Sequence, residues 1–191
     1  MRTIKFNTKI ILDKLSNHKK LKPKILDIIN KSNKNVFKHN NDFYSDRISK
    51  CDWFDSENKD REWVKIIKKD IYKSFKKFSK ELGFDHCDVY NIWFQQYEKK
   101  DCHNWHIHNH SYTGVYYLQF PKSSPQTELE DPFNYDKRFF IPAQEGDIVI
   151  FPSFIIHRGG WMNNNSTKTI ISFNITFAKL TSKVLKQLGK Q

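Results

Sequence analysis

Residues 103–118 read HNWHIHNHSYTGVYYL and place a histidine cluster directly before the most strand-like run of the chain. Four imidazoles fall within eight residues: His103, His106, His108 and His110. The run that follows, YTGVYYLQF (112–120), is rich in aromatic and β-branched residues, which favour strands. Histidine is the commonest metal ligand in proteins, so the cluster suggests a metal site. A histidine-rich turn on the surface is the alternative.

Three further runs have the composition of strands. They are DVYNIWFQQY (88–97), GDIVIFPS (146–153) and KTIISFNITF (168–177), each bounded by Gly, Pro, Asn or Lys. Between 120 and 146 lies a long connection punctuated by prolines, and connections of that length usually have a function or contain short strands. Many short strands after a helical first half predict a sheet or barrel supported by helices.

The strand predicted over 168–177 has two different faces, because successive side chains of a strand point to opposite sides. One face is apolar and carries Thr169, Ile171, Phe173, Ile175 and Phe177. The other carries Lys168, Ile170, Ser172, Asn174 and Thr176 and is too polar for a dry core. We expect this second face to line a pocket or to contact solvent.

The first half of the chain is predicted to be mostly helical. Its strongest signal runs from Trp63 to Leu82, where apolar residues recur every three or four positions, and Gly83 follows as a helix cap. A shorter helix is predicted over KPKILDIINKS (22–32), and the tail from about Ser182 reads as a frayed basic helix. The Trp63–Leu82 stripe is suited to pack on the apolar face of the last strand.

Length and cysteine content favour a single cytoplasmic domain. The 191 residues suffice for one core, and no apolar run approaches the roughly 20 residues that span a bilayer. No secretory signal is recognisable at the N-terminus, and we predict no membrane partner. Cys51, Cys87 and Cys102 fit no paired spacing, so we expect reduced thiols.

The net charge of +12 is unevenly distributed. Residues 1–81 hold 22 Lys and Arg against 11 Asp and Glu, whereas residues 82–191 hold 11 against 10. The excess is lysine, 28 against 5 Arg, although phosphate and base recognition often use the forked guanidinium. We favour the compositional drift of an AT-rich genome, and a polyanionic or ribosomal partner for the first half stays open.

His106 and His108 are spaced i and i+2, so in an extended backbone both imidazoles point to the same side. An iron centre of the facial-triad type needs a third protein ligand and leaves positions free for substrate and dioxygen. His157 fits that role, since it follows GDIVIFPS at a strand end and precedes a Gly-Gly turn. We expect His103 and His110 to support the ligands or face the substrate, and His18, His39 and His86 to have no role in the metal site.

Three ordered segments resemble the 2-oxoglutarate- and Fe(II)-dependent oxygenases, in particular the prolyl-hydroxylase-like branch found in phage and marine bacterial genomes. They are WFQQYEKKDCHNWHIHNHSYTGVYYLQFP, EGDIVIFPSFIIHRGG and KTIISFNI, with a fainter match in ISKCDWF (48–54). The resemblance implies an α+β, mainly β fold: a double-stranded β-helix, or cupin-like jelly roll, with supporting N-terminal helices. We divide this single domain into a basic helical support (1–83), a jelly-roll catalytic core (84–180) and a basic tail (181–191).

The resemblance also implies a ligand set. His106 would be the first iron ligand and His157 the distal one, while His108 stands where the family commonly has a carboxylate. Three neutral imidazoles would leave Fe(II) its full charge, which a dianionic co-substrate would neutralise. If His108 does not bind, the centre resembles the two-histidine sites that leave a position for a halide. Asp101 is a remote alternative carboxylate.

The co-substrate site follows from the same resemblance. The family has an Arg on the strand after the distal His, and Lys168 occupies that position here. A Lys is a point charge without the bidentate fork, so it should bind 2-oxoglutarate more loosely unless hydroxyl groups contribute. Ser172 shares the Lys168 face, Tyr117 matches a tyrosine of the family, and Tyr97 is a weaker candidate.

The implied activity couples the oxidative decarboxylation of 2-oxoglutarate to succinate with the hydroxylation of a substrate. It would use Fe(II), 2-oxoglutarate and O2, with ascorbate as a candidate reductant. We favour a protein side chain such as proline as the substrate, with nucleic acid or a small metabolite as alternatives, in the cytoplasm (the host cytoplasm if the protein is viral). Part of 121–142, which carries Phe133, Tyr135, Phe139 and Phe140, is expected to be a flap over the iron.

Two other classes stay open. His106, His108 and His110 also resemble the HxHxDH motif of metallo-β-lactamase-like hydrolases, although the Asp is missing and no helix obviously follows. A preference for zinc over iron would favour that class. The other class is a non-catalytic jelly-roll module whose basic half binds RNA or a ribosome, which a failure to bind any metal would favour.

Overall fold

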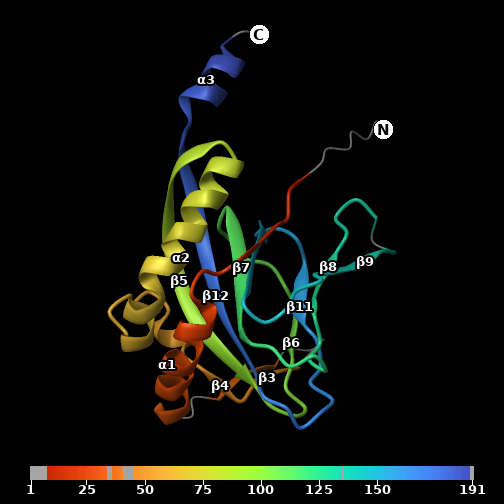
Figure 1. Cartoon of the computed structure of the whole chain (residues 1–191). Helices are drawn as coiled ribbons and strands as arrows, with labels where there is room; N and C mark the ends of the chain where they lie inside the picture. Colours follow the sequence, from red (N-terminus) through yellow and green to blue (C-terminus); the bar gives the residue numbers. More distant parts are fainter. Residues whose placement is uncertain (1–7, 34–35, 41–44, 135, 190–191) are drawn as a thin grey trace.

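Two antiparallel β-sheets and a pair of helices make up the body of the protein, shown in Figure 1 as a computed structural model that describes residues 8–33, 36–40, 45–134 and 136–189. The helices are α1 (His18–Lys31), α2 (Glu62–Glu81) and α3 (Ser182–Leu188), with a 3-10 turn η1 (Trp53–Asp55). None of the described helices is long and apolar enough to cross a membrane.

The large sheet has six strands, and most of its paired strands are not neighbours in the sequence. Its order is β1 (Ile11–Lys14), β10 (Asp147–Pro152), β7 (Tyr112–Gln119), β12 (Lys168–Leu180), β5 (Phe84–Tyr97) and β4 (Lys50–Cys51). The small sheet has the order β6 (His103–His106), β11 (His157–Gly159), β8 (Thr127–Glu130) and β9 (Arg138–Phe140). A separate hairpin consists of β2 (Phe37–Asn40) and β3 (Ser45–Ile48).

The large sheet lies between two apolar cores, because its strands alternate between buried faces. One core packs under α1 and α2, and Ile171 and Phe173 of β12 belong to it. The other core lies between the two sheets and joins Val149 and Tyr117 of the large sheet to Leu129 of the small one. Figure 1 shows the resulting order of helices, large sheet and small sheet.

The predicted contact between α2 and the apolar face of β12 is confirmed. The rings of Phe75 and Phe173 pack with their centroids 4.7 Å apart, and Phe75 is fully buried. After α2 the chain turns at Gly83, whose φ of +84° lies in the left-handed region that favours glycine. The predicted stripe therefore serves packing.

We expect Phe75→Ala to lower the free energy of unfolding by about 3 to 5 kcal/mol, since it removes a buried ring and leaves a cavity under β12. Phe54, which is 85% exposed, is a matched control whose replacement by Ala should change stability by less than about 0.5 kcal/mol. Urea denaturation measures both variants. Equal stability of the two would contradict the packing described for α2.

The four strands predicted after Gly83 are confirmed as β5, β7, β10 and β12, the centre of the large sheet. The N-terminal region differs from the prediction, because four short strands accompany its helices. Two of these, β1 and β4, belong to the large sheet. A strand of two to four residues is too short to show a period, which explains why the sequence did not indicate them.

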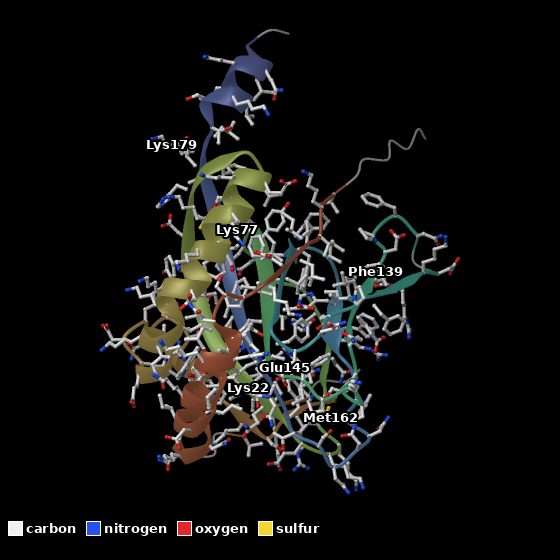
Figure 2. All side chains as sticks on the ribbon, in the orientation of Figure 1. Lys22, Lys77, Phe139, Glu145, Met162 and Lys179 are labelled. Atoms are coloured by element: carbon white, nitrogen blue, oxygen red, sulfur yellow. The ribbon has the colours of Figure 1, made fainter. Side chains whose placement is uncertain are left out.

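The proline-rich connection over 121–142 contains two short strands of the small sheet, β8 and β9, which is one of the two possibilities that its length suggested. Leu129 of β8 lies opposite His157 of β11, so this part of the connection is a fixed strand. Phe139 and Phe140 on β9 are about half exposed at the sheet edge, and Figure 2 shows Phe139 away from the α2 layer marked by Lys77. Of the aromatic residues assigned to a flap, Tyr135 lies outside the described residues.

Candidate metal centre

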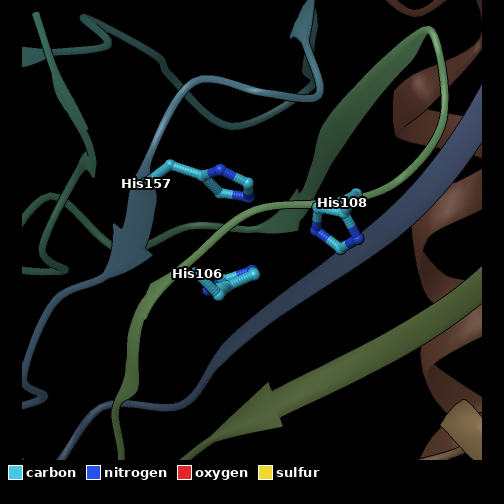
Figure 3. A group of neighbouring side chains, drawn as sticks. All are labelled: His106, His108 and His157. Atoms are coloured by element: carbon cyan, nitrogen blue, oxygen red, sulfur yellow. The ribbon is translucent and has the colours of Figure 1, made fainter. Parts of the chain in front are cut away.

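Three histidines from two segments converge between the sheets, as Figure 3 shows. His106 ends β6 and His157 begins β11, and the two are direct antiparallel partners. His108 follows β6 by two residues, and its main-chain N–H donates to the Ser153 carbonyl at 3.0 Å. One ring nitrogen from each histidine lies within 4.8 Å of the others, a spacing that suits one metal ion. The sequence therefore predicted a group that the structure brings together.

Hydrogen bonds fix the tautomers of two of these rings. The Nδ1 atom of His106 lies 2.6 Å from the Asn104 carbonyl oxygen, and that of His157 lies 2.8 Å from the Ile155 carbonyl oxygen. A carbonyl oxygen only accepts, so each Nδ1 carries the hydrogen and donates it. Each Nε2 atom is left with a free lone pair, the arrangement typical of metal-binding histidines.

The electrostatics also favour neutral imidazoles. Burial lowers the pKa of His106, and burial together with the neighbouring imidazoles lowers the pKa of His157 well below its usual value. The same causes lower the pKa of His108 to about 3. All three rings are thus unprotonated near neutral pH, which is the form that binds a metal.

No carboxylate joins the three histidines within the part of the chain that the structure describes. Asp101, the remote alternative, is fully buried elsewhere. Its carboxylate accepts hydrogen bonds from the main-chain N–H groups of Ser49 and Glu98, both at 2.8 Å, and lies 3.2 Å from Nε of Arg47. These contacts hold the β3 region against the loop before β6, so Asp101 has a structural role.

Of the other five histidines, the four whose side chains the structure describes do not belong to this group. His103 stacks on His106 with ring centroids 3.9 Å apart, and His110 packs on Tyr90 at 4.6 Å. His18 bonds to the Tyr116 hydroxyl at 2.7 Å, and His86 is exposed beside Asp88. The side chain of His39 lies outside the described residues. In an HxHxDH site, His110 would be one of the metal-binding residues. In this structure it lies outside the group of three histidines.

Lys168 is the second distinctive feature of the site. It is 1% exposed, and its Nζ atom donates to the Pro125 carbonyl at 3.2 Å. The rings of Tyr97 and Phe120 lie near the ammonium group, with centroids 4.9 and 5.7 Å away. Burial lowers the pKa of Lys168 to about 8. No carboxylate among the described residues forms an ion pair with it. Burial of a cation that has no ion-pair partner destabilises the folded protein.

One cavity joins the three histidines to Lys168, and Tyr97 and Ser172 also line it. The predicted polar face of β12 is therefore confirmed as a cavity wall. The Ser172 hydroxyl donates to Oε1 of Gln95 at 2.9 Å. The cavity is narrow, with a free interior of about 30 Å³.

Tyr117 is placed differently from the prediction. It does not line the cavity but is fully buried in the core between the sheets. Its hydroxyl donates to Oγ1 of Thr127 at 2.8 Å, and burial raises its pKa. Thr127 does line the cavity, so Tyr117 reaches the site only through that hydroxyl.

Gln95 and Arg158 are among the cavity-lining residues that the sequence analysis did not predict. Gln95 lies between Trp93 and Tyr97, and the alternation of these three residues on one face of β5 was the available signal. Arg158 follows His157 directly, and it pairs with Glu128 at 2.9 Å while its guanidinium lies 4.6 Å from the Trp105 ring centroid. Neither contact was visible in the local sequence, because the partners come from other strands.

No protein-family model matches the sequence, and no curated protein matches it significantly. Solved structures do resemble it. A prolyl hydroxylase from Trichoplax adhaerens, in complex with a hypoxia inducible factor peptide fragment, is 14% identical, with a TM-score of 0.62 over 95% of this chain and 87% of that one. A 2OG-Fe(II) oxygenase family oxidoreductase from Burkholderia pseudomallei is 7% identical, with a TM-score of 0.66 over 84% and 81%.

A third similar structure is SnoN, a non-heme α-ketoglutarate-dependent epimerase from nogalamycin biosynthesis. It is 9% identical, with a TM-score of 0.67 over 88% of this chain and 78% of that one. At such identities the likeness establishes the fold, and the predicted double-stranded β-helix is confirmed. Since one of these proteins is a hydroxylase and another an epimerase, the reaction has to be argued from the site itself.

Proposed function

We propose that the protein is a 2-oxoglutarate- and Fe(II)-dependent dioxygenase that hydroxylates its substrate. The observation that carries this proposal is a single cavity with three neutral histidines at one position and a buried lysine at another, and no described carboxylate pairs with that lysine. The histidines suit a divalent metal, and the lysine suits the distal carboxylate of a dicarboxylic acid. The double-stranded β-helix fold, which the chain shares with oxygenases of this type, supports the same assignment.

The residues present fit such a metal. Imidazole nitrogen is a suitable ligand for iron, and His106, His108 and His157 would hold the ion from one side. Bound iron would supply the activation of dioxygen that couples 2-oxoglutarate decarboxylation to substrate oxidation. The chain itself orients Nε2 of His106 and of His157 through the Nδ1–H bonds to main-chain carbonyls. No feature of the described residues supports ascorbate as a reductant.

Lys168 would contribute charge neutralisation. A carboxylate that enters the cavity replaces an unpaired buried cation by an ion pair, which offsets part of the cost of desolvating both groups. Tyr97 lies on the same cavity wall and offers a hydroxyl group that can donate to the same anion, whereas the hydroxyl of Ser172 would first have to leave Oε1 of Gln95. These positions are where the sequence predicted the co-substrate to bind.

The affinity for 2-oxoglutarate should fall as pH rises above about 8. The pKa of Lys168 is lowered to about 8 in the free protein, and a bound carboxylate favours its charged form. Below that pH the ammonium is already present, and above it each complex formed must take up a proton. The dissociation constant should therefore rise by up to about tenfold per pH unit.

Anaerobic calorimetry of 2-oxoglutarate binding to the metal-loaded protein at several pH values measures this dependence. Repeating each titration in two buffers of different ionisation enthalpy reports the proton uptake directly. A dissociation constant that stays constant from about pH 7 to about pH 10 would move the carboxylate away from Lys168.

A protein side chain is the substrate that we favour. An aromatic pocket of about 280 Å³ lies beside His106 and His108, and its lining includes Phe37, Trp53 and Trp93. Its apolar walls suit a compact apolar side chain such as proline. The solved prolyl hydroxylase from Trichoplax adhaerens is in complex with a peptide fragment, which supports the same choice. Mass spectrometry of lysate proteins treated with the loaded enzyme tests it, with added oxygen as the expected result.

A second candidate function rests on a separate groove between α1 and α2. Its lining includes Lys20, Lys24, Lys69 and Lys73, all exposed, and one carboxylate, Asp70, which already bonds to Asn17 at 2.9 Å. Such a basic groove favours the polyanion expected for the first half of the chain. Salt-dependent binding of an RNA oligonucleotide, lost when these four lysines are replaced by Ala, would support this function.

A further inference from the structure

A second hollow, here named the β5 groove, opens beside the metal centre. It has a volume of about 530 Å³, and its lining includes Trp53, Tyr90, Asn91, Ile107, His108 and Asn174. The aromatic pocket shares Trp53, Ile107 and His108 with it. The two hollows therefore meet around His108, and a ligand long enough to fill both would pass next to the metal centre.

The floor of the β5 groove holds a buried acceptor without a hydrogen-bond partner. Asn174 is 1% exposed, and its Nδ2 atom donates to Oδ1 of Asn91 at 3.4 Å. Asn91 in turn donates to the Ser56 hydroxyl at 3.0 Å, which sets the orientation of both amides. The Oδ1 atom of Asn174 has no partner among the described residues. A buried acceptor without a hydrogen-bond partner lowers the stability of the folded protein. This atom therefore indicates a ligand that donates a hydrogen bond to it.

An irregularity of the large sheet adds an aromatic wall. Asn91 and Val89 lie opposite the consecutive residues Asn174 and Ile175, so Tyr90 is an extra residue in β5. Neighbouring residues of a regular strand point to opposite faces, but this bulge lets Tyr90 and Asn91 line the same groove. Tyr90 is 55% exposed and packs on His110.

We propose that the β5 groove binds the stretch of peptide that adjoins the reacting residue. In this assignment Asn174 accepts a hydrogen bond from a main-chain N–H of that stretch, and Tyr90 and Trp53 pack on its side chains. The inference rests on the proposed function and adds a positioning residue to it. Among the described residues, the lining contains Glu57 and neither Lys nor Arg, which fits a peptide and disfavours a nucleic acid. An extended peptide also presents a main-chain donor at every residue except proline.

Two peptide pools test the assignment without depending on turnover. One is a pool of capped tetrapeptides of mixed sequence, and the other is the same pool with N-methylated main-chain nitrogens. We expect the first pool to shift the NMR signals of the Asn91 and Asn174 side-chain amides in 15N-asparagine-labelled protein, and the second pool to leave them in place. Equal shifts with both pools would overturn the role of Asn174. Shifts of the same size with N-methylacetamide alone would indicate a small amide in place of a peptide.

Variants sharpen the test. Tyr90→Ala, at an exposed position that folding tolerates, should weaken binding of the first pool by about tenfold or more, while Tyr72→Ala on α2 should not change it. Unchanged binding in Tyr90→Ala would contradict the proposal. Succinate release without peptide, measured in parallel, separates the two hypotheses. Peptide binding without succinate would refute only the oxygenase function, and succinate without amide shifts would refute only the groove.

Discussion

Replacing either His106 or His157 by alanine should abolish metal binding and 2-oxoglutarate turnover together. Each ring presents an Nε2 lone pair whose direction is fixed by an Nδ1–H bond to a main-chain carbonyl, at 2.6 and 2.8 Å. Changes to groups that merely orient a ligand typically lower metal affinity by about 10- to 100-fold, so the loss of the ligand itself should exceed that range. His86→Ala, an exposed histidine beside Asp88, is the matched control and should keep full affinity.

His108 decides between the possible ligand sets. If it binds the metal, His108→Ala should weaken iron affinity and His108→Asp should restore much of it, because a carboxylate is a suitable ligand at that position. Full iron affinity in His108→Ala would leave two protein ligands and favour the two-histidine centre with a free position. Comparison of Fe(II) with Zn(II) in the same titration, with succinate as the readout, separates the oxygenase from a zinc hydrolase.

Removing Lys168 should have opposite effects on ligand binding and on stability. Without the cation, the distal carboxylate of 2-oxoglutarate would be buried unpaired, which typically costs about 3 to 5 kcal/mol and corresponds to a 10²- to 10³-fold weaker affinity or more. The free protein should become more stable in Lys168→Met. The pKa of Lys168 is lowered to about 8, so below that pH its charge opposes folding by up to about 3 kcal/mol.

Urea denaturation and anaerobic calorimetry on the same Lys168→Met sample measure the two effects. Lys168→Arg should retain part of the affinity because it keeps the charge, although the longer guanidinium has to fit a cavity of about 30 Å³. A Lys168→Met variant that binds 2-oxoglutarate normally would assign the carboxylate to another cation, and Arg158, which lines the same cavity from the small sheet, is then the candidate.

The sequence predicted those parts of the fold that depend on long periodic patterns. The α2 stripe around Phe75 and the two faces of β12 each repeat over many residues, and the structure confirms both. The i, i+2 spacing of His106 and His108 can likewise be seen in a short stretch of sequence. The convergence of His157 with them depended on its position at a strand end and on the family resemblance.

The parts that the sequence did not predict depend on contacts between distant segments. The strands of the small sheet are three to four residues long, and His106 pairs with His157 across about 50 residues of chain. Tyr117 has the alternation of a cavity residue, yet its hydroxyl turns to Thr127 on another strand. The unpaired Oδ1 atom of Asn174 likewise arises from a sheet register that no local pattern encodes.

The most direct test of the central claim is anaerobic titration of 2-oxoglutarate into the protein with and without Fe(II), followed by admission of air. We expect one molecule of 2-oxoglutarate to bind per chain when Fe(II) is present, and succinate to form once oxygen enters. Neither result should occur with His106→Ala. Tight binding of Fe(II) with no binding of 2-oxoglutarate and no succinate would contradict the assignment of this cavity to an oxygenase.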